Sequence, residues 1–271
     1  MLKQRIITAL VLLPFALGGF FLLEGALFAL FIGAVVSLGA WEWARLAGFT
    51  AQTQRVAYAL LVAVLLFGLY QLPELSTWLL LLGVVWWGGA TFLVLGYPAS
   101  SQYWAGTPVK LVIGLLILLP AWQGLVLFKQ WPEANWLILA VMVLVWGADI
   151  GAYFSGRRFG KRKLAPQVSP GKSWEGVFGG LLATLLICIG VGLYRDWSFV
   201  SLVLALLGTA LVVLISVVGD LTESMFKRQA GIKDSSNLLP GHGGVLDRID
   251  SLTAAIPLFA ALLWLAGWGV Q

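Results

Sequence analysis

The sequence predicts an all-α polytopic membrane protein, built as one integral membrane domain of about nine transmembrane helices. Only 11% of the 271 residues are charged and 60% are hydrophobic, whereas about a quarter of the residues of a soluble domain are charged. The apolar runs are continuous rather than alternating, which indicates helices and excludes a transmembrane β-barrel. The positive net charge does not indicate nucleic acid as a partner, because the cations flank the apolar runs, where membrane topology explains them.

The first half of the chain contains five apolar runs, each long enough for a helix of about 20 residues that crosses the hydrocarbon core. These runs cover about residues 6–23, 25–44, 56–71, 77–96 and 109–128. Lys3 and Arg5 precede the first run, as cations do in a signal peptide. However, a small-residue cleavage site is missing and a second span follows at once, so we expect the first span to be retained.

The second half contains four apolar runs, at about residues 135–154, 174–194, 198–219 and 252–269. The two longest polar segments of the chain, residues 155–173 and 220–251, separate them. We therefore divide the domain into residues 1–134, a scaffold that can also make dimer contacts, and residues 135–271, which carry the catalytic helices and loops.

The distribution of lysine and arginine predicts the orientation of the nine spans. With the N-terminus in the cytoplasm, fifteen of the 17 cations fall on the cytoplasmic side and only Lys129 and Arg195 fall on the outer side. Cytoplasmic loops of membrane proteins carry such an excess of cations. We expect both long polar segments to face the cytoplasm and the C-terminus to lie on the outer side.

Residues 219–251 hold the densest group of ionisable side chains. Its members are five carboxylates, four fixed cations and the only histidine, namely Asp220, Glu223, Asp234, Asp247, Asp250, Lys227, Arg228, Lys233, Arg248 and His242. Asp220, Glu223 and Lys227 share one helix face at spacings of three and four residues, and Asp247 and Asp250 are three apart. These two acidic pairs, at the ends of consecutive spans, can converge on a magnesium ion, which prefers carboxylate oxygens.

The cations and glycines of the same stretch suit a phosphorylated substrate. The four cations can neutralise the charge that develops in phosphoryl chemistry, and the glycine turn at residues 240–244 lets backbone amides approach an anion closely. The alternative is an ordinary juxtamembrane loop whose charges orient the helices, but ionisable groups at membrane depth favour a site. His242 can serve as acid, base or phosphate donor, or simply bond a carbonyl group.

The segment from Trp146 to Gly176 contains further candidates. Asp149 lies within a predicted span, where it either lines the site or makes an interhelical hydrogen bond, and Gly147 and Gly151 beside it permit close helix packing. The basic cluster at residues 157–163 fits a topology and lipid-headgroup signal.

Residues 169–173 resemble part of a phosphate loop, but the required first glycine is replaced by Pro166. Ser173 can instead cap the next helix, and Lys172, just outside that helix, suits an anion. In the first half, Glu42 can pair with Arg45 or extend to the membrane interface, so we assign it no role in the site.

Three segments carry a family resemblance. The residues Ser224-Met-Phe-Lys227-Arg228, Lys233-Asp234 and Pro240-Gly-His-Gly-Gly-Val-Leu-Asp-Arg-Ile-Asp250 resemble the signature of the phosphatidate cytidylyltransferase (CDP-diacylglycerol synthase) family. The segments DIGAYFSGRRFGK and SPGKSWEG are also similar to family features. The resemblance covers almost the whole chain, although the N-terminal third resembles the family only in its hydrophobic character.

This resemblance implies a magnesium-dependent reaction of CTP with phosphatidate in the bacterial inner membrane, giving CDP-diacylglycerol and pyrophosphate, and it implies a homodimer. It points to Asp220 and Asp247 as metal ligands; we add Asp250 to them and leave open a second cation. We expect catalytic roles for Asp220, Asp247, Lys227 and His242. We expect substrate contacts from Lys172, Ser173, Arg228, Lys233, Arg248 and Asp149.

Other classes of protein stay open at this point. His242 and Asp247 have the H-x4-D spacing of glycerolipid acyltransferases, although we find none of the companion motifs. Many spans with buried acids suit an ion-coupled transporter, but the charges gather at one face and no inverted repeat is visible. A purely structural membrane subunit would leave the charged stretch unexplained.

Overall fold

The computed structural model describes residues 2–268, with side chains for residue 8 and residues 10–268. In this part of the chain there are nine α-helices. Their bounds are α1 (Leu2–Phe21), α2 (Gly25–Leu46), α3 (Gln52–Gln71), α4 (Ser76–Leu95), α5 (Thr107–Gln130), α6 (Ala134–Phe159), α7 (Trp174–Tyr194), α8 (Phe199–Gln229) and α9 (Leu246–Leu265). The number of helices agrees with the nine predicted spans, whereas the prediction that α1 also crosses the membrane stays a prediction. The side chains of Lys3 and Arg5, and residue 269 at the predicted end of the last span, lie outside the described residues.

Eight of these helices, α2 to α9, are long and apolar enough to cross a membrane. In α1 the described apolar part covers Leu10–Phe21. The many large apolar side chains that face outward, such as Phe67, Val85 and Phe92, have lipid as their natural surroundings. The chain is thus a multi-pass α-helical membrane protein.

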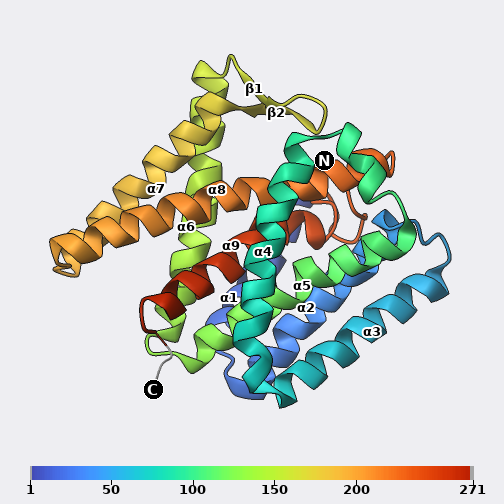
Figure 1. Cartoon of the computed structure of the whole chain (residues 1–271), viewed down its shortest axis with the longest axis horizontal. Helices are drawn as coiled ribbons and strands as arrows, with labels where there is room; N and C mark the ends of the chain where they lie inside the picture. The colour runs from blue at the N-terminus through green and yellow to red at the C-terminus, as the bar shows by residue number, and fades with distance from the viewer. Residues whose placement is uncertain (1, 269–271) are drawn as a thin grey trace.

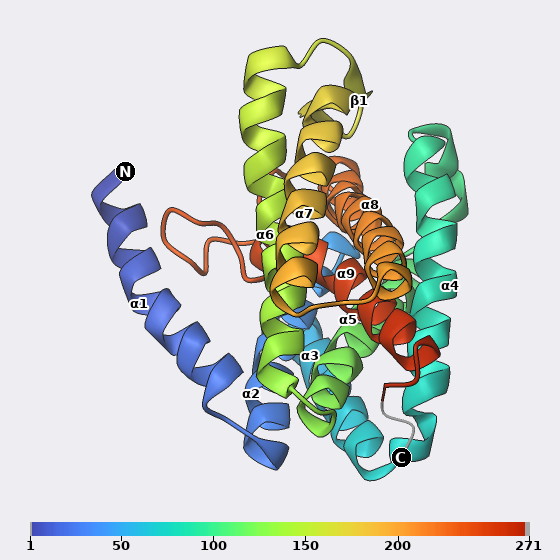
Figure 2. The ribbon, with the colours of Figure 1, turned by 90° about the vertical axis from the view of Figure 1, so that its left-hand side faces the viewer.

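Helix α9 lies in the middle of the bundle and packs against α2, α4, α5, α6 and α8 (Figure 1). Helices α6 and α7 form a close antiparallel pair, because a Cβ atom at Gly151 would lie only 2.8 Å from the carbonyl oxygen of Gly179. The predicted role of Gly151 in close helix packing is confirmed. Helix α1 stands at the side of the bundle, and the loop between α8 and α9 reaches toward it (Figure 2). The Thr8 hydroxyl donates a hydrogen bond of 2.9 Å to the Pro240 carbonyl oxygen of that loop.

Helix α8 is longer than the sequence predicts. The predicted span ends at residue 219, where the polar segment begins, but the helix continues to Gln229. Its extra turns are amphipathic: Leu221, Met225 and Phe226 are buried, and their spacing keeps one apolar face toward the bundle. With 31 residues, α8 is about 47 Å long, more than the hydrocarbon core of about 30 Å requires.

The start of α9 and the segment before α7 also differ from the prediction. Helix α9 begins at Leu246 rather than near residue 252. The segment expected as an irregular loop forms a small antiparallel hairpin, with β1 (Lys163–Ala165) paired to β2 (Ser169–Ser173). An all-α prediction misses this hairpin because its strands are only three and five residues long, too short for an alternating pattern to be recognised.

Aromatic rings pack around the C-terminal end of α8. The Phe226 ring lies 4.4 Å from the Trp104 ring and 4.7 Å from the Trp43 ring, measured between centroids. All three side chains are almost completely buried. The Trp43 indole Nε1 donates to the Lys110 carbonyl oxygen at 2.7 Å. This packing fixes the helical turn that carries Lys227, the next residue after Phe226.

Candidate active site

The charged stretch is brought together where the end of α8 meets the start of α9. The backbones are close at this crossing, because a Cβ atom at Gly219 would lie 2.7 Å from the Asp250 carbonyl oxygen. The close approach sets Asp220 on α8 near the first turns of α9, which carry Asp247 and Asp250. The two helix ends therefore meet, whereas the convergence of their acidic pairs on a magnesium ion stays a prediction.

A buried lysine connects two of the predicted carboxylates. The Lys227 ammonium nitrogen lies 2.6 Å from Asp247 Oδ1 and 3.1 Å from Glu223 Oε1. The three side chains are only 10%, 6% and 4% exposed. Breaking a buried ion pair by removing one partner is strongly destabilising, since it leaves an uncompensated charge. This cluster of two carboxylates and one ammonium therefore holds the two helices in register.

A second ion pair joins the hairpin to α8. Lys172 Nζ on β2 lies 2.6 Å from Asp220 Oδ2, and the Ser224 hydroxyl donates to Asp220 Oδ1 at 3.2 Å. Both charged side chains are about a quarter exposed, so water-soluble ligands can reach this pair. The structure thus brings together two of the predicted site residues from segments almost 50 positions apart.

Asp247 also organises the loop between α8 and α9. Its Oδ2 accepts hydrogen bonds from the Ser235 backbone N–H at 2.9 Å, the Ser235 hydroxyl at 2.8 Å and the Gly244 N–H at 2.8 Å. The carboxylate therefore has partners on both oxygens. One predicted alternative, an acyltransferase dyad, gains no support, because His242 and Asp247 form no hydrogen bond in the described part of the chain.

Glu42 on α2 is the residue of this site that sequence reasoning missed. It is completely buried and accepts four hydrogen bonds, from the Val245 and Leu246 N–H groups at 3.0 and 2.6 Å and from the Ser236 and Ser235 hydroxyls at 2.6 and 3.3 Å. The sequence suggested that Glu42 pairs with Arg45 or extends to the membrane interface, and the structure shows neither arrangement. A carboxylate at a helix N-terminus satisfies unpaired N–H groups and complements the helix dipole. Glu42 therefore caps α9.

The glycine turn lets the loop pass close to these carboxylates. The backbone at Gly244 presses against the Ser235 hydroxyl and the Glu42 carboxylate so tightly that a Cβ atom has no room. Gly241 and Gly243 have φ angles of 77° and 80°, in the left-handed region that favours glycine. His242 lies between them, and its Nδ1 atom is buried with no hydrogen-bond partner among the described residues.

The other predicted site residues vary in their contacts. The Ser173 hydroxyl accepts a hydrogen bond from the Gly176 N–H at 3.2 Å, so the predicted cap of α7 is confirmed. Arg228 donates to the carbonyl oxygen of Val168 at 3.1 Å, which fastens the hairpin to the end of α8. No hydrogen bond or ion pair is formed, among the described residues, by the side chains of Asp149, Lys233 and Arg248. Their contacts with substrate stay predictions.

The donor chemistry of the site suits a magnesium ion, but the carboxylates are held by lysines in this arrangement. Among the described residues, no group of three or more Asp, Glu, His or Cys side chains is arranged to hold a metal. Magnesium commonly uses only one or two protein carboxylates and takes its other ligands from water and phosphates. Among the described residues, the buried Glu223 carboxylate is contacted only by Lys227, at 3.1 Å from Oε1, and its Oε2 atom has no partner.

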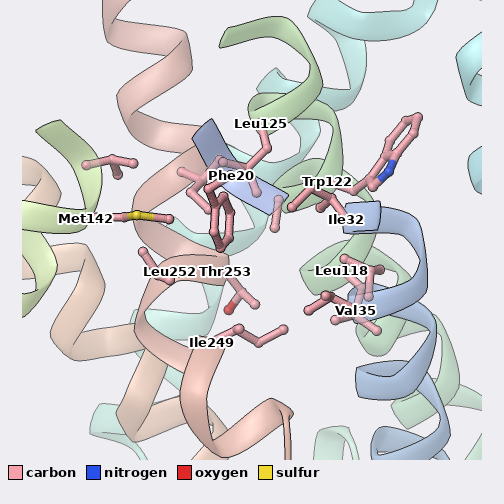
Figure 3. Close-up of a pocket in the computed structure, with 14 residues that line it drawn as sticks. Phe20, Ile32, Val35, Leu118, Trp122, Leu125, Met142, Ile249, Leu252 and Thr253 are labelled. Atoms are coloured by element: carbon pink, nitrogen blue, oxygen red, sulfur yellow. The ribbon is translucent and has the colours of Figure 1, made fainter. Parts of the chain in front are cut away.

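Two apolar spaces lie near the site. One is a small cavity of about 40 Å³ between α1, α2, α5, α6 and α9, lined by side chains such as Phe20, Trp122 and Ile249 (Figure 3). Its walls offer almost no polar partners for water, so it is a packing defect rather than a ligand site. The other is a groove of about 340 Å³ between α4, the hairpin, α7 and α8.

Together these features define a polytopic membrane protein whose charged site, at the ends of two helices, combines carboxylates, lysines and an adjoining apolar groove. This is the class of membrane enzymes that act on phosphorylated substrates. The chain matches the model of the cytidylyltransferase family over residues 3–266, and it belongs to that family.

Relatives from several bacteria agree with this assignment. A phosphatidate cytidylyltransferase of Pseudomonas aeruginosa is 78% identical, and the match covers 99% of each chain. One of Haemophilus influenzae is 44% identical over 96% of this chain and 98% of its own. One of Brucella suis is 37% identical over 98% of this chain and 93% of its own. The resemblance seen in the sequence is confirmed over the whole length, including the N-terminal third.

Proposed function

We propose that this protein is a phosphatidate cytidylyltransferase, which transfers the cytidylyl group of CTP to phosphatidate and releases pyrophosphate. The observation that carries the proposal is the nearly full-length match, at 78% identity, to a relative named for that activity. The structure supports it independently, because lysines and carboxylates gather beside an apolar groove. One substrate would be a charged nucleotide and the other a phosphate on a lipid.

The lipid phosphate is the nucleophile, and it is already anionic at neutral pH, so no strong base is required. One of its oxygens forms a bond to the α-phosphorus of CTP while the bond from that phosphorus to the β-phosphate oxygen breaks. Pyrophosphate leaves with the electron pair of the broken bond. Catalysis of such a step is mostly positioning and neutralisation of charge.

The lysines are the groups best placed to supply that neutralisation. Lys172 and Lys227 are each held by a carboxylate within 2.6 Å, so their ammonium groups already point into the charged site. We assign both to substrate phosphates, with Arg228, Lys233 and Arg248 as outer contacts and Ser173 and Asp149 as further contacts. The unpartnered Nδ1 of His242 suits a hydrogen bond to a phosphate oxygen.

Asp220 and Asp247, with Asp250, would hold magnesium, and a bound magnesium ion would neutralise charge on the reacting phosphates. In the present arrangement Asp220 and Asp247 are each neutralised by a lysine. A lysine that moves to a phosphate leaves a carboxylate oxygen free for a cation. The exchange keeps every charge paired in surroundings of low polarity, where an unpaired charge is costly.

The site is assigned to the cytoplasmic face, where CTP is available. The excess of lysine and arginine in the segments on that side supports this orientation, with the N-terminus in the cytoplasm and the C-terminus outside. We further propose a homodimer, and a division of labour in which residues 135–271 supply the substrate contacts. Glu42 shows that residues 1–134 also support the catalytic loop.

The experiment that tests the function is conversion of phosphatidate to CDP-diacylglycerol by the purified protein in detergent, with CTP present or absent and with or without magnesium. Product that requires both CTP and magnesium is expected. No product from a folded sample would overturn the proposal. Release of free coenzyme A from an acyl-CoA donor, without any need for CTP, would instead support the acyltransferase alternative.

A further inference from the structure

The Lys172–Asp220 ion pair joins β2 to α8, and the hairpin and α8 both line the apolar groove of about 340 Å³. The groove walls include Val218 and Leu221, which flank Asp220 in the sequence, and Trp174, two residues after Lys172. The ion pair therefore links two of the elements that form the groove, although its own side chains are not among the lining residues. A ligand with a charged head and an apolar tail could contact both at once.

The opposite wall of the groove comes from the hairpin and from α4. Val168, in the turn between β1 and β2, lines the groove, and its carbonyl oxygen is held by Arg228 Nε at 3.1 Å. Leu95, at the end of α4, lines the groove from the other side. The groove is thus formed by four separate elements, and polar contacts hold two of them, the hairpin and α8, together.

We propose that this groove holds one acyl chain of the phosphatidate substrate, with the glycerol phosphate at the Lys172–Asp220 pair. This inference rests on the proposed function and adds the place of the lipid tail. The walls are mostly apolar, so CTP would find few partners there, whereas an acyl chain loses little by entering. The cations Lys172 and Arg228 at its border complement the negative charge of the lipid phosphate.

The size of the groove fits part of a lipid rather than a whole one. Sites for small ligands commonly enclose about 300–1,000 Å³, and the groove is near the lower limit. One chain therefore enters and the second stays in the bilayer. Lipid is as apolar as the groove, so burial of the chain adds little hydrophobic free energy. The groove instead sets the position of the phosphate relative to Lys172.

A filling substitution tests this inference through kinetics. Val218→Trp places a large ring in the groove, whereas Val203→Trp makes the same change on α8 at a position outside the groove. We expect Val218→Trp to raise KM for dioleoyl phosphatidate by at least about fivefold, as overpacking does. KM for CTP and for dihexanoyl phosphatidate, whose short chains do not need the groove, should stay within about twofold. Val203→Trp should leave all three unchanged.

An unchanged KM for dioleoyl phosphatidate in Val218→Trp would overturn the inference. An equal rise in KM for both lipids and for CTP would also overturn it, because Val218 would then have no particular effect on the long acyl chains.

A second measurement does not depend on turnover. Phosphatidate with a diazirine in one acyl chain is irradiated with the protein in nanodiscs, and the labelled peptides are identified by mass spectrometry. We expect labelling of residues 164–168 and 214–221 that excess dioleoyl phosphatidate removes. Labelling confined to lipid-facing surfaces such as that of α3, and not reduced by excess dioleoyl phosphatidate, would refute the proposal that the groove holds an acyl chain. Competed labelling without CTP turnover would refute the proposed function and leave the groove.

Discussion

Replacement of Glu42 by glutamine tests whether this carboxylate holds the loop between α8 and α9 in place. Glutamine has nearly the same shape, but its NH₂ group must face one of the donors that Glu42 accepts. If the amide oxygen keeps the hydrogen bond from the Val245 N–H, the NH₂ group faces the Leu246 N–H, which donates to Glu42 Oε2 at 2.6 Å in the native protein. Two donors then face each other. A buried donor without an acceptor costs about 1–3 kcal/mol, and a lost charge at a helix N-terminus costs about 0.3–1 kcal/mol more.

The free energy that favours the docked loop over the open loop should therefore fall by about 1.3–4 kcal/mol, which corresponds to a factor of about ten or more in the opening equilibrium. Hydrogen–deuterium exchange of the Val245 and Leu246 amides measures this loss directly, because these amides exchange when the loop opens. We expect exchange at least about tenfold faster in Glu42→Gln, and a fall in kcat for CTP-dependent turnover because Asp247 binds the same loop.

The matched control is Glu24→Gln, which removes an exposed carboxylate just before α2, the helix that carries Glu42. It should leave both exchange and turnover at wild-type values. Glu42→Ala removes both acceptor oxygens, and with them all four hydrogen bonds, so its effect should exceed that of glutamine. Wild-type exchange at residues 245 and 246 in Glu42→Gln would refute the reasoning, since the hydrogen bonds would then contribute nothing to docking.

The remaining predictions concern the charged site and the hairpin. Asp220→Asn should remove nearly all CTP-dependent turnover in protein that still inserts and folds; near wild-type activity would contradict the metal assignment. Asp247→Asn should also remove turnover and should in addition lower Tm, because it weakens the buried pair with Lys227; near wild-type activity in this variant would likewise contradict the assignment. Arg157→Gln should change turnover little, because Arg157 is exposed and, among the described residues, its side chain hydrogen-bonds only to Tyr153; a large loss would move the site toward residues 155–173. Ser173→Ala should lower the free energy of unfolding by about 1 kcal/mol through loss of the α7 cap; an unchanged Tm would argue against the cap.

The number and approximate place of the helices were predictable because apolar runs of about 20 residues report directly on membrane spans. Their ends were less predictable. The charge of Asp220 ends the apolar run, yet α8 continues, since Leu221, Met225 and Phe226 bury a second, narrower apolar face. Hydropathy measures the average around a helix, whereas this continuation depends on one side of it.

The candidate site was predictable where its contacts are local. The pairing of Glu223 with Lys227 follows from their spacing of four residues, and the cap by Ser173 follows from its place before α7. The contacts of Glu42 and the pairing of Lys172 with Asp220 join segments far apart in the chain. Only the packing of the helices determines them, so no local pattern could identify them.

The burial of Glu42 also constrains how the protein is made. Its hydrogen-bond partners lie 193 to 204 positions later in the chain, so the ribosome delivers α2 to the membrane well before residues 235–246 exist. During that interval the carboxylate depends on water or lipid headgroups for its hydrogen bonds. The first half of the protein can insert early, but the site around Glu42 is complete only after the α8–α9 loop has been translated.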